Sequence, residues 1–349
     1  MKLNRRDFIT ASGVALAAPA ILRSGAARAQ DAVSLRLHHF LPPVSNVHQH
    51  LLMPWAKALD EQSGGKLKVE IFPGMQLGGK PPQLYDQAAN CVVDIVWTLP
   101  GNTPGRFPST EVFELPFIPA QKATVNAPAA QEYGELHLAK ETADTKILCF
   151  WGHDQGLLHT NKEIKTKDDL AGLKLRNPTR LAGEALAALG ATPVGMPVPQ
   201  VPEALAQGAI DGCVIPWEVV PSVKVDELTK FHTEIPGSPT LYIATFFLAM
   251  NKAKYEGLPA DVKKVLDDNS GAAFAKAAGA MWDNVGAEVR KAVEGKGSVS
   301  AIAEDEKARW VEATKPVHDK WIADVKAKGL DGEALIKSAQ DMIAKYSQA

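Results

Sequence analysis

The first half of the chain alternates between segments with strand periodicity and segments with helix periodicity. Three segments predict strands, at residues 34–40, 67–72 and 92–98. Two segments between them predict helices, at residues 47–62 and 83–90. This β-α-β-α-β order predicts a parallel sheet with right-handed crossovers, and therefore an α/β fold.

The same alternation returns after a Pro- and Gly-rich segment at residues 100–119. Further strands are predicted at residues 147–151, 173–176, 210–215 and 242–250, with a helix near 181–189. From residue 261 to residue 348 the chain is mostly helical. About 320 residues follow the N-terminal segment, more than one hydrophobic core usually supports. We therefore expect two domains, braced by long C-terminal helices.

The N-terminal segment has the three-part layout of an export signal. Arg5-Arg6 precedes an apolar run at residues 11–22, and Ala27-Arg28-Ala29 offers the small residues that a signal peptidase reads. The run is shorter than the roughly 20 apolar residues of a bilayer-spanning helix. We therefore predict a twin-arginine export signal at residues 1–29 and a mature protein in a bacterial periplasm.

The net charge of the chain makes nucleic acid an unfavourable partner. Residues 1–29 carry five basic groups and one acidic group, so their removal changes the formal net charge from −2 to −6. A mildly acidic protein has no electrostatic attraction for nucleic acid. An anionic ligand must then be captured by individual arginines.

The three cysteines, Cys91, Cys149 and Cys213, each lie in an apolar, strand-like context. This context favours buried free thiols. One disulfide with one free thiol is the alternative in an oxidising compartment. The cysteine spacings fit no zinc site.

The segment Asp168–Arg176 predicts a capped helical turn, a glycine stop and a short strand that ends on Arg176. Ligands of α/β proteins bind at the carboxyl ends of the strands. The planar guanidinium can hold a carboxylate through two parallel hydrogen bonds. The segment therefore predicts a site for a small organic anion.

Trp217 and Glu218 follow the predicted strand at 210–215, so the same rule makes them candidates. Trp217 could stack on a ligand, and Glu218 could accept a hydrogen bond from a hydroxyl or contact a bound cation. In the alternative interpretation, Trp217 packs between the domains and Glu218 is solvated.

Other candidates also lie just beyond strand ends. Arg106, in a proline-stiffened loop, could contact an anion or simply lie on the surface. Trp97 could form a wall of a pocket, although aromatic residues at strand ends are often core. Four side chains after the strand at 147–151 could reach a cleft: Trp151, His153, Asp154 and Gln155.

Four histidines, His38, His39, His48 and His50, fall within a short stretch of the chain. A metal site is one hypothesis, because imidazole is a common ligand of transition metals. His48 and His50 lie about 200° apart on a helix, however, and no acidic residue or cysteine is close in sequence. Hydrogen bonding near a cleft and purely structural roles remain the alternatives.

Motifs of the common enzyme classes are missing from the sequence. It has no Gly-x-Ser-x-Gly, P-loop, Gly-x-Gly-x-x-Gly or His-Glu-x-x-His pattern. A periplasmic metal- or cofactor-dependent enzyme exported by the twin-arginine route remains the alternative to a binding protein. An adhesion or structural protein would need repeats or exposed apolar stripes that the sequence lacks.

Five blocks carry a resemblance to a known family: residues 64–78, 93–96, 114–117, 169–176 and 206–212. In these blocks the chain resembles the solute-binding proteins of tripartite ATP-independent periplasmic (TRAP) transporters, the DctP-like family. The resemblance covers essentially the whole chain after the export signal.

The resemblance implies a two-lobed α/β binding protein that closes a ligand in an interlobe cleft and is not an enzyme. It implies that Arg176 forms the salt bridge to the ligand carboxylate. The partners would be a small and a large permease subunit in the membrane, to which the ligand is delivered. The expected division is residues 31–148 with about 240–275 in lobe I, 149–239 with about 300–349 in lobe II, and a linking helix at about 276–299.

The chain departs from sialic-acid and dicarboxylate members of the family at two places. Residues 213–218 replace a Glu-Asn-Pro-like segment, and residues 153–156 lack a second arginine. These departures favour a monocarboxylate, either aromatic or a 2-oxo or 2-hydroxy acid. The expected companions of Arg176 are Trp217, Trp97, Phe40, His39 and His153. No cofactor is expected, although the resemblance allows a ligand-bridging cation held by Glu218 and Gln155.

Overall fold

Two mixed β-sheets organise residues 32–296 and 298–348, which the computed structural model describes. The predicted export signal at residues 1–29 lies outside these residues. The first sheet has the order β2-β1-β3-β10-β4, with β1 (Val33–His38), β2 (Leu67–Phe72), β3 (Ile95–Thr98), β4 (Thr145–Gly152) and β10 (Thr245–Asn251). The second has the order β11-β9-β5-β8-β6-β7, with β5 (Leu157–Thr160), β6 (Lys174–Asn177), β7 (Thr192–Gly195), β8 (Gly212–Ile215), β9 (Phe231–Glu234) and β11 (Ser298–Ala301).

The pairing confirms the predicted parallel arrangement of the first three strands. β1 pairs parallel to both β2 and β3, while β10 is antiparallel to β3 and β4. In the second sheet β6 is parallel to β7 and β8, and β5 is antiparallel to β8 and β9. The strands β5, β7, β9 and β11 were not predicted, because none of them contains a run of three apolar residues like those of the equally short β3 and β8.

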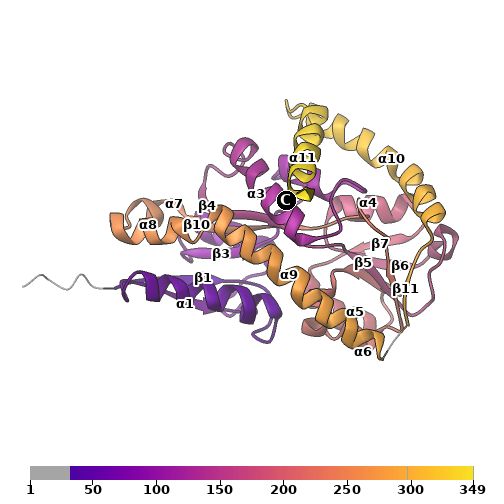
Figure 1. Ribbon diagram of the computed structural model, residues 1–349, viewed down its shortest axis with the longest axis horizontal. Helices are drawn as coiled ribbons and strands as arrows, with labels where there is room; N and C mark the ends of the chain where they lie inside the picture. The colour runs from indigo at the N-terminus through magenta and orange to yellow at the C-terminus, as the bar shows by residue number, and fades with distance from the viewer. Residues whose placement is uncertain (1–31, 297, 349) are drawn as a thin grey trace, which may run out of the picture. The chain divides into compact units, whose positions relative to one another are not determined.

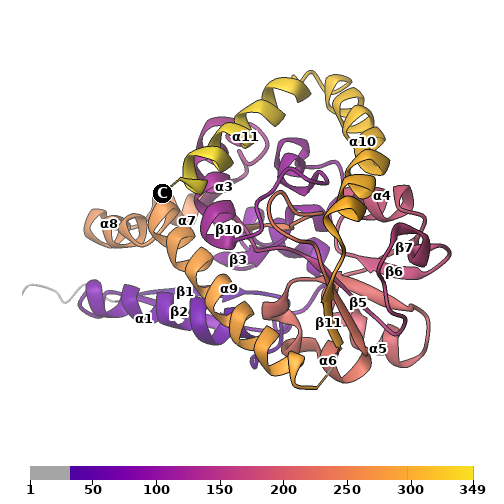
Figure 2. The same cartoon turned by 45° about the vertical axis from the view of Figure 1, so that its right-hand side comes forward.

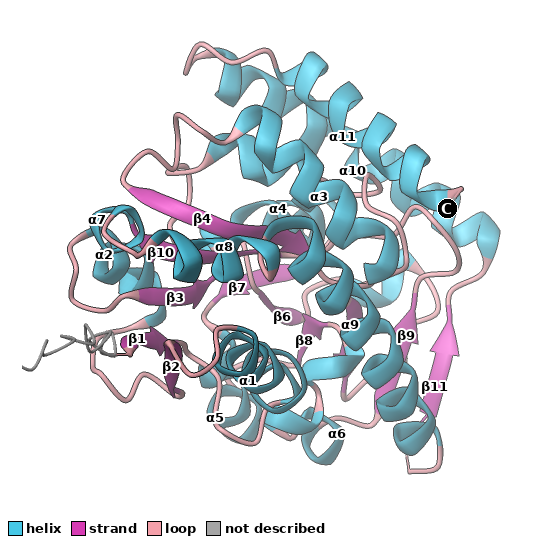
Figure 3. Cartoon of the chain, turned by 60° about the vertical axis from the view of Figure 1, so that its left-hand side comes forward, coloured by secondary structure: helices cyan, strands magenta, loops and turns pink. Residues whose placement is uncertain are grey.

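Helices cover the two sheets (Figure 3). The α-helices are α1 (Met53–Gln62), α2 (Leu84–Ala89), α3 (Ala123–His137), α4 (Arg180–Ala188), α5 (Val201–Ala206), α6 (Val225–Leu228), α7 (Lys252–Glu256), α8 (Ala260–Asp268), α9 (Gly271–Glu294), α10 (Glu304–Lys326) and α11 (Gly332–Ser347). A π-helix, η1 (His48–Leu52), precedes α1. Short 3₁₀ turns are η2 (Pro81–Gln83), η3 (Pro100–Asn102), η4 (Pro108–Glu114), η5 (Lys167–Leu170), η6 (Val198–Gln200), η7 (Trp217–Val219) and η8 (Pro221–Val223).

The chain passes from one sheet to the other more than once in the described part. We call the first sheet with its helices the first lobe, and the second sheet with its helices the second lobe. The segments β4–β5 and β9–β10 cross between the lobes. The long helix α9 packs on α3 and β4 of the first lobe and on η7 of the second (Figures 1 and 2). The predicted boundary between residues 148 and 149 falls inside β4, whose residues other than Leu148 pair with β10 in the first sheet.

The last two helices contact different lobes. Helix α10 packs on α4 of the second lobe, and α11 packs on α3 of the first. This arrangement confirms that long C-terminal helices brace both sheets. Gly279 allows α9 to approach α3 closely, because a Cβ at this position would lie 2.7 Å from the carbonyl oxygen of Ala123. The approach fixes the position of α9, which contributes a side chain to the site.

The three cysteines are free thiols in the structure. Cys149 and Cys213 are buried, as predicted, and the prediction of burial is wrong for Cys91, which is exposed. Cys91 lies in the turn after α2 with a φ of 58°, so it is not part of the following strand. The apolar residues that follow Cys91 lead into β3, but Cys91 itself lies in the turn before this strand.

Candidate functional site

A cavity lies between the two lobes, where several strands of both sheets end. Its volume is about 50 Å³, which is room for roughly three to five water molecules. Such a space suits a small organic molecule better than a peptide or a nucleotide. The lining residues are Phe40, Leu41, Trp97, Leu99, His153, Arg176, Pro178, Val198, Ile215, Pro216, Glu218, Val219, Tyr242, Ala244, Phe246 and Trp282.

Arg176 is a buried cation in this lining. Its side chain projects from β6 and is held by two backbone carbonyls: Nε donates to Met196 O at 2.9 Å and Nη1 to Val214 O at 3.2 Å. The residue is 2% exposed, and burial lowers the pKa of its guanidinium. Within the described residues it forms no ion pair with a carboxylate. A buried charge without a counter-ion is costly, so the site is suited to receiving an anion.

Tyr242 places a second hydrogen-bond donor in the lining. Its hydroxyl is buried and has no hydrogen-bond partner among the described residues. Burial raises the pKa of the phenol, which therefore stays protonated and able to donate. The ring fits against Gly156, where a Cβ would lie 2.2 Å from two ring carbons. Arg176 and Tyr242 together offer a charged donor and a neutral donor to one ligand.

His153 contributes a neutral wall to the cavity. Its Nε2 accepts a hydrogen bond from the Ala244 amide at 2.8 Å, so the ring proton is on Nδ1, which faces the carbonyl oxygen of Asp154. Burial lowers the pKa of His153 to about 4. Both ring nitrogens are occupied within the protein, and the imidazole carries no charge at neutral pH. It therefore shapes the cavity without pairing with an anion.

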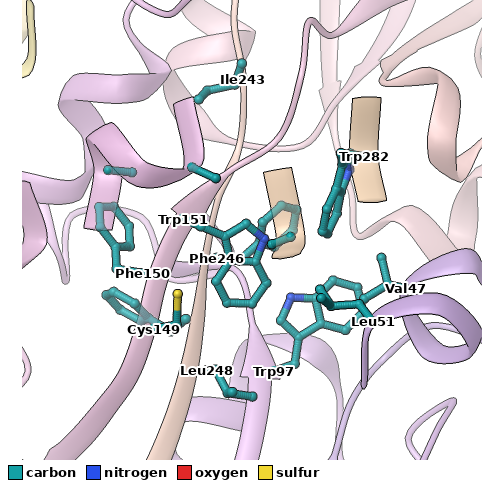
Figure 4. Close-up of a cluster of buried hydrophobic side chains, with 14 of the residues drawn as sticks. Val47, Leu51, Trp97, Cys149, Phe150, Trp151, Ile243, Phe246, Leu248 and Trp282 are labelled. Atoms are coloured by element: carbon teal, nitrogen blue, oxygen red, sulfur yellow. The ribbon is translucent and has the colours of Figure 1, made fainter. Parts of the chain in front are cut away.

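Aromatic rings form much of the remaining wall. The centroids of Phe40 and Trp97 are 4.7 Å apart, and those of Trp97 and Phe246 are 5.5 Å apart. Phe246 in turn stacks on Trp282 with centroids 5.4 Å apart (Figure 4). The indole nitrogens of Trp97 and Trp282 are buried without a partner among the described residues. Such walls favour a flat apolar group.

Glu218 is the carboxyl group of the lining. It is 1% exposed, so the alternative of a solvated Glu218 is wrong. Burial raises its pKa to about 8, against a hydrogen bond from the Val47 backbone that lowers it. The carboxyl group is therefore mostly protonated at neutral pH. Its Oε1 has no hydrogen-bond partner in the described part of the chain.

Two of the predicted candidates are held by partners outside the cavity lining. Trp217 Nε1 donates to Glu234 Oε1 at 2.9 Å, and its ring packs against the ring of His159 with centroids 5.3 Å apart. Arg106 forms an ion pair with Asp86 at 2.7 Å, and its guanidinium lies over the ring of Tyr85. Neither side chain lines the cavity.

His39 and Gln155 also lie behind the lining. His39 Nε2 is 3.0 Å from His48 Nδ1, and the His39 ring packs against Trp97, which does line the cavity. Gln155 is buried after β4, and its Oε1 has no partner among the described residues. Neither residue lines the cavity, and His39 supports its wall through the contact with Trp97.

The histidine cluster near the N-terminal strand is divided between separate hydrogen bonds. His38 Nδ1 is 2.7 Å from Gln87 Oε1, whereas His39 bonds His48 and His50 is exposed. Across residues 32–296 and 298–348, no group of three or more His, Cys, Asp or Glu side chains is arranged to hold a metal ion. Burial lowers the pKa of His39 to about 3, so this ring is neutral.

Three aromatic residues of the lining were not predicted as candidates: Tyr242, Phe246 and Trp282. Tyr242 precedes β10 and Phe246 lies in it. The sequence predicted this strand but not its place in the first sheet. Trp282 lies on α9, where a single large aromatic residue in an Ala-rich helix was the available signal. The structure therefore brings Phe40, Trp97, His153, Arg176 and Glu218 together and adds these three.

Comparison with protein families identifies the chain. Residues 37–324 match the family described as bacterial extracellular solute-binding protein, family 7 (DctP). The chain belongs to this family. In the described residues, no helix combines the length and the apolar character needed to cross a membrane.

Relatives of the chain are solute-binding proteins of TRAP transporters. A protein from Rhodoferax ferrireducens, solved with co-purified benzoate, is 45% identical, with a TM-score of 0.88 over 91% of this chain and 99% of that one. A marine metagenome protein solved with 3-hydroxybenzoate is 46% identical, with a TM-score of 0.88 over 90% and 99%. The C4-dicarboxylate-binding protein of Rhodobacter capsulatus is 28% identical over 80% of this chain and 83% of that protein.

These comparisons establish the class of the protein. The family and its solved members bind solutes for transporters, so the chain is a TRAP solute-binding protein and not an enzyme. The match to two-lobed structures agrees with the two sheets and long C-terminal helices of this chain. TRAP solute-binding proteins bind small organic acids and work with membrane permease subunits.

Proposed function

We propose that this protein captures an aromatic monocarboxylate in the periplasm through a salt bridge between Arg176 and the ligand carboxylate. The observation that carries the proposal is the buried Arg176 guanidinium, which has no carboxylate partner among the described residues and faces a cavity walled by aromatic rings. An arginine fork can donate hydrogen bonds to both oxygens of a carboxylate.

The charge balance of the cavity favours one carboxylate over two. Arg176 is the arginine of the lining, and His153 is neutral because burial lowers its pKa to about 4. A second carboxylate on the ligand would be desolvated without a cation, which is costly. The Tyr242 hydroxyl supplies a neutral hydrogen bond to the single carboxylate.

The aromatic walls favour a ring on that ligand. Phe40, Trp97, Phe246 and Trp282 present apolar faces to the cavity, and each buried ring contact contributes beyond its area. The solved relatives support this class, since they hold benzoate, 3-hydroxybenzoate and, in a 30% identical protein from Bordetella bronchiseptica, (R)- and (S)-mandelate. We propose the same class for this chain.

Delivery of the ligand to the membrane is part of the proposal. The lobes close on the ligand, and the closed protein hands it to a TRAP permease of small and large subunits. The crossing segments β4–β5 and β9–β10 would serve as the hinge. We propose that residues 1–29 direct export by the twin-arginine route.

A thermal-shift panel tests the function directly. Benzoate, 3-hydroxybenzoate and mandelate should raise the melting temperature in a concentration-dependent way, because a ligand that binds only the folded state stabilises it. Succinate and pyruvate are the matched negative ligands: the first carries two carboxylates and the second lacks a ring. Stabilisation by succinate without stabilisation by any aromatic acid would contradict the proposal.

A further inference from the structure

Glu218 is a buried polar group that takes no part in the proposed salt bridge between Arg176 and the ligand carboxylate. The residue is 1% exposed and lines the same cavity as Arg176. Its Oε1 has no hydrogen-bond partner among the described residues. Buried polar atoms in native proteins nearly always have a partner, and an atom of a residue that lines a ligand cavity can find that partner on the ligand.

The second lobe and the first lobe together hold Glu218 in place. Its backbone belongs to η7, and the carbonyl oxygen accepts a hydrogen bond from Asn46 Nδ2 at 2.7 Å. The Val47 backbone acts against burial and lowers the pKa of the carboxyl group. The backbone of Glu218 is therefore held across the lobe boundary, and its Oε1 is left without a partner among the described residues.

No ion pair occupies the carboxyl group of Glu218 in the described part of the chain. Asp154, on the segment after β4, lies close enough that Glu218 contributes to raising its pKa, and Asp283 on α9 contributes more strongly. The nearby Glu234 of β9 is occupied by Arg290 at 2.8 Å and by Trp217. A neutral hydrogen-bonding group on the ligand therefore fits Glu218 better than an anion does.

We propose that Glu218 recognises a hydroxyl group on the ring of the ligand, so that the protein selects hydroxylated aromatic monocarboxylates over unsubstituted ones. This inference rests on the proposed function, because it assumes that Arg176 holds the carboxylate in the same cavity. A phenolic hydroxyl donates to Oε1. An unsubstituted ring would bury Oε1 without any partner.

The physical reason for selectivity is the asymmetry of buried hydrogen bonds. A site that is built to bond a substrate hydroxyl rejects the analogue without one, because its own polar atom is left unsatisfied. The raised pKa of Glu218, about 8, is compatible with this role, since both the protonated and the ionised carboxyl can accept the bond. An apolar side chain at this position would remove the discrimination.

The test is calorimetry on the full chain with benzoate, the three hydroxybenzoate isomers and the matching fluorobenzoates. A fluorine substituent occupies a similar position but cannot donate a hydrogen bond. We expect at least one hydroxybenzoate to bind about tenfold more tightly than both benzoate and its fluoro counterpart. Equal affinity of every hydroxy and fluoro pair would overturn the assignment, and this comparison needs no variant.

Two substitutions sharpen the result. Glu218→Leu should reduce the preference for the hydroxylated acid over benzoate to about twofold or less, whereas Glu218→Gln should keep most of it, since the amide oxygen also accepts a hydrogen bond. Glu333→Gln, at an exposed position on α11, is the matched control and should keep the wild-type ratio. An unchanged ratio in Glu218→Leu would overturn the role of Glu218.

The outcomes separate this inference from the proposed function. If benzoate binds the wild type and no hydroxybenzoate binds more tightly, the inference fails and the proposed function stands. If neither benzoate nor any hydroxybenzoate binds, both fail.

Discussion

Replacement of Arg176 by Met tests the salt bridge that the proposed function requires. Methionine keeps an unbranched side chain of similar length and removes the charge and the fork. In the ligand-free protein the change leaves the carbonyl oxygens of Met196 and Val214 without their donors, at about 1–3 kcal/mol each. It also removes a buried cation that has no counter-ion among the described residues, which offsets part of that loss. The ligand-free variant should therefore remain folded.

The loss of affinity should be much larger than the change in stability. A carboxylate brought into the cavity without its cation is a buried, unpaired charge, which costs about 3–5 kcal/mol. Since 1.4 kcal/mol is a factor of ten, benzoate should bind Arg176→Met roughly 140- to 4,000-fold more weakly. The affinity of Arg176→Lys for benzoate should lie between those of the wild type and Arg176→Met, because lysine keeps the charge but lacks the planar fork.

Thermal shift and calorimetry measure this difference together. At a benzoate concentration of 100 times the wild-type Kd, the wild type gains about 2.7 kcal/mol of stability. The same concentration is below the Kd of Arg176→Met and adds less than about 0.4 kcal/mol. Arg309→Met, which removes an exposed arginine side chain on α10 that is absent from the cavity lining, is the matched control and should bind like the wild type. Binding by Arg176→Met within fivefold of the wild type would refute the salt bridge.

Three further substitutions test other parts of the structure. Burial raises the pKa of Glu114 from 4.5 to about 8. The protonated carboxyl group therefore stabilises the folded state fully below pH 4.5, and this stabilisation is lost as the pH rises through 8, which lowers the Tm. Glu114→Gln should make this decrease in Tm with pH smaller. Arg180→Gln should lower the free energy of unfolding in urea by about 3 kcal/mol, because it breaks the 2.6 Å ion pair to buried Glu111; Lys337→Gln, at an exposed pair, should cost less than about 1 kcal/mol. Trp97→Leu should weaken benzoate binding in calorimetry by about 1–2 kcal/mol, and an unchanged Kd would place the ligand away from this ring.

The candidate site could be predicted in part because strand ends converge. Phe40, Trp97, His153, Arg176 and Glu218 all follow or end predicted strands, and the structure brings them to one cavity. The carboxyl ends of parallel strands meet at one edge of a sheet, so a local pattern is enough to nominate them. The same rule nominated Arg106 and Trp217, which the structure holds outside the lining.

The differences between the predicted candidates and the residues of the cavity lining share a physical cause. Arg106 forms an ion pair with Asp86 on α2, and Trp217 donates a hydrogen bond to Glu234 on β9. Tyr242 and Trp282 enter the cavity on a crossing segment and on a long helix, neither of which is placed by the strand-end rule. Which partner a polar side chain finds depends on residues far away in the sequence, and hydrophobic periodicity carries no record of that pairing.

The sequence by itself determined the α/β alternation, the strands β1, β2, β3, β4, β6, β8 and β10, and an arginine near the end of β6, because periodicity and strand ends are properties of short segments. The family membership followed from blocks that can be read along the chain. Only the tertiary structure decided that Arg176 bonds two carbonyls and no carboxylate among the described residues, and that Glu218 is buried with a free oxygen. Burial and pairing are set by long-range packing, and they turn a strand-end arginine into a candidate site for one carboxylate.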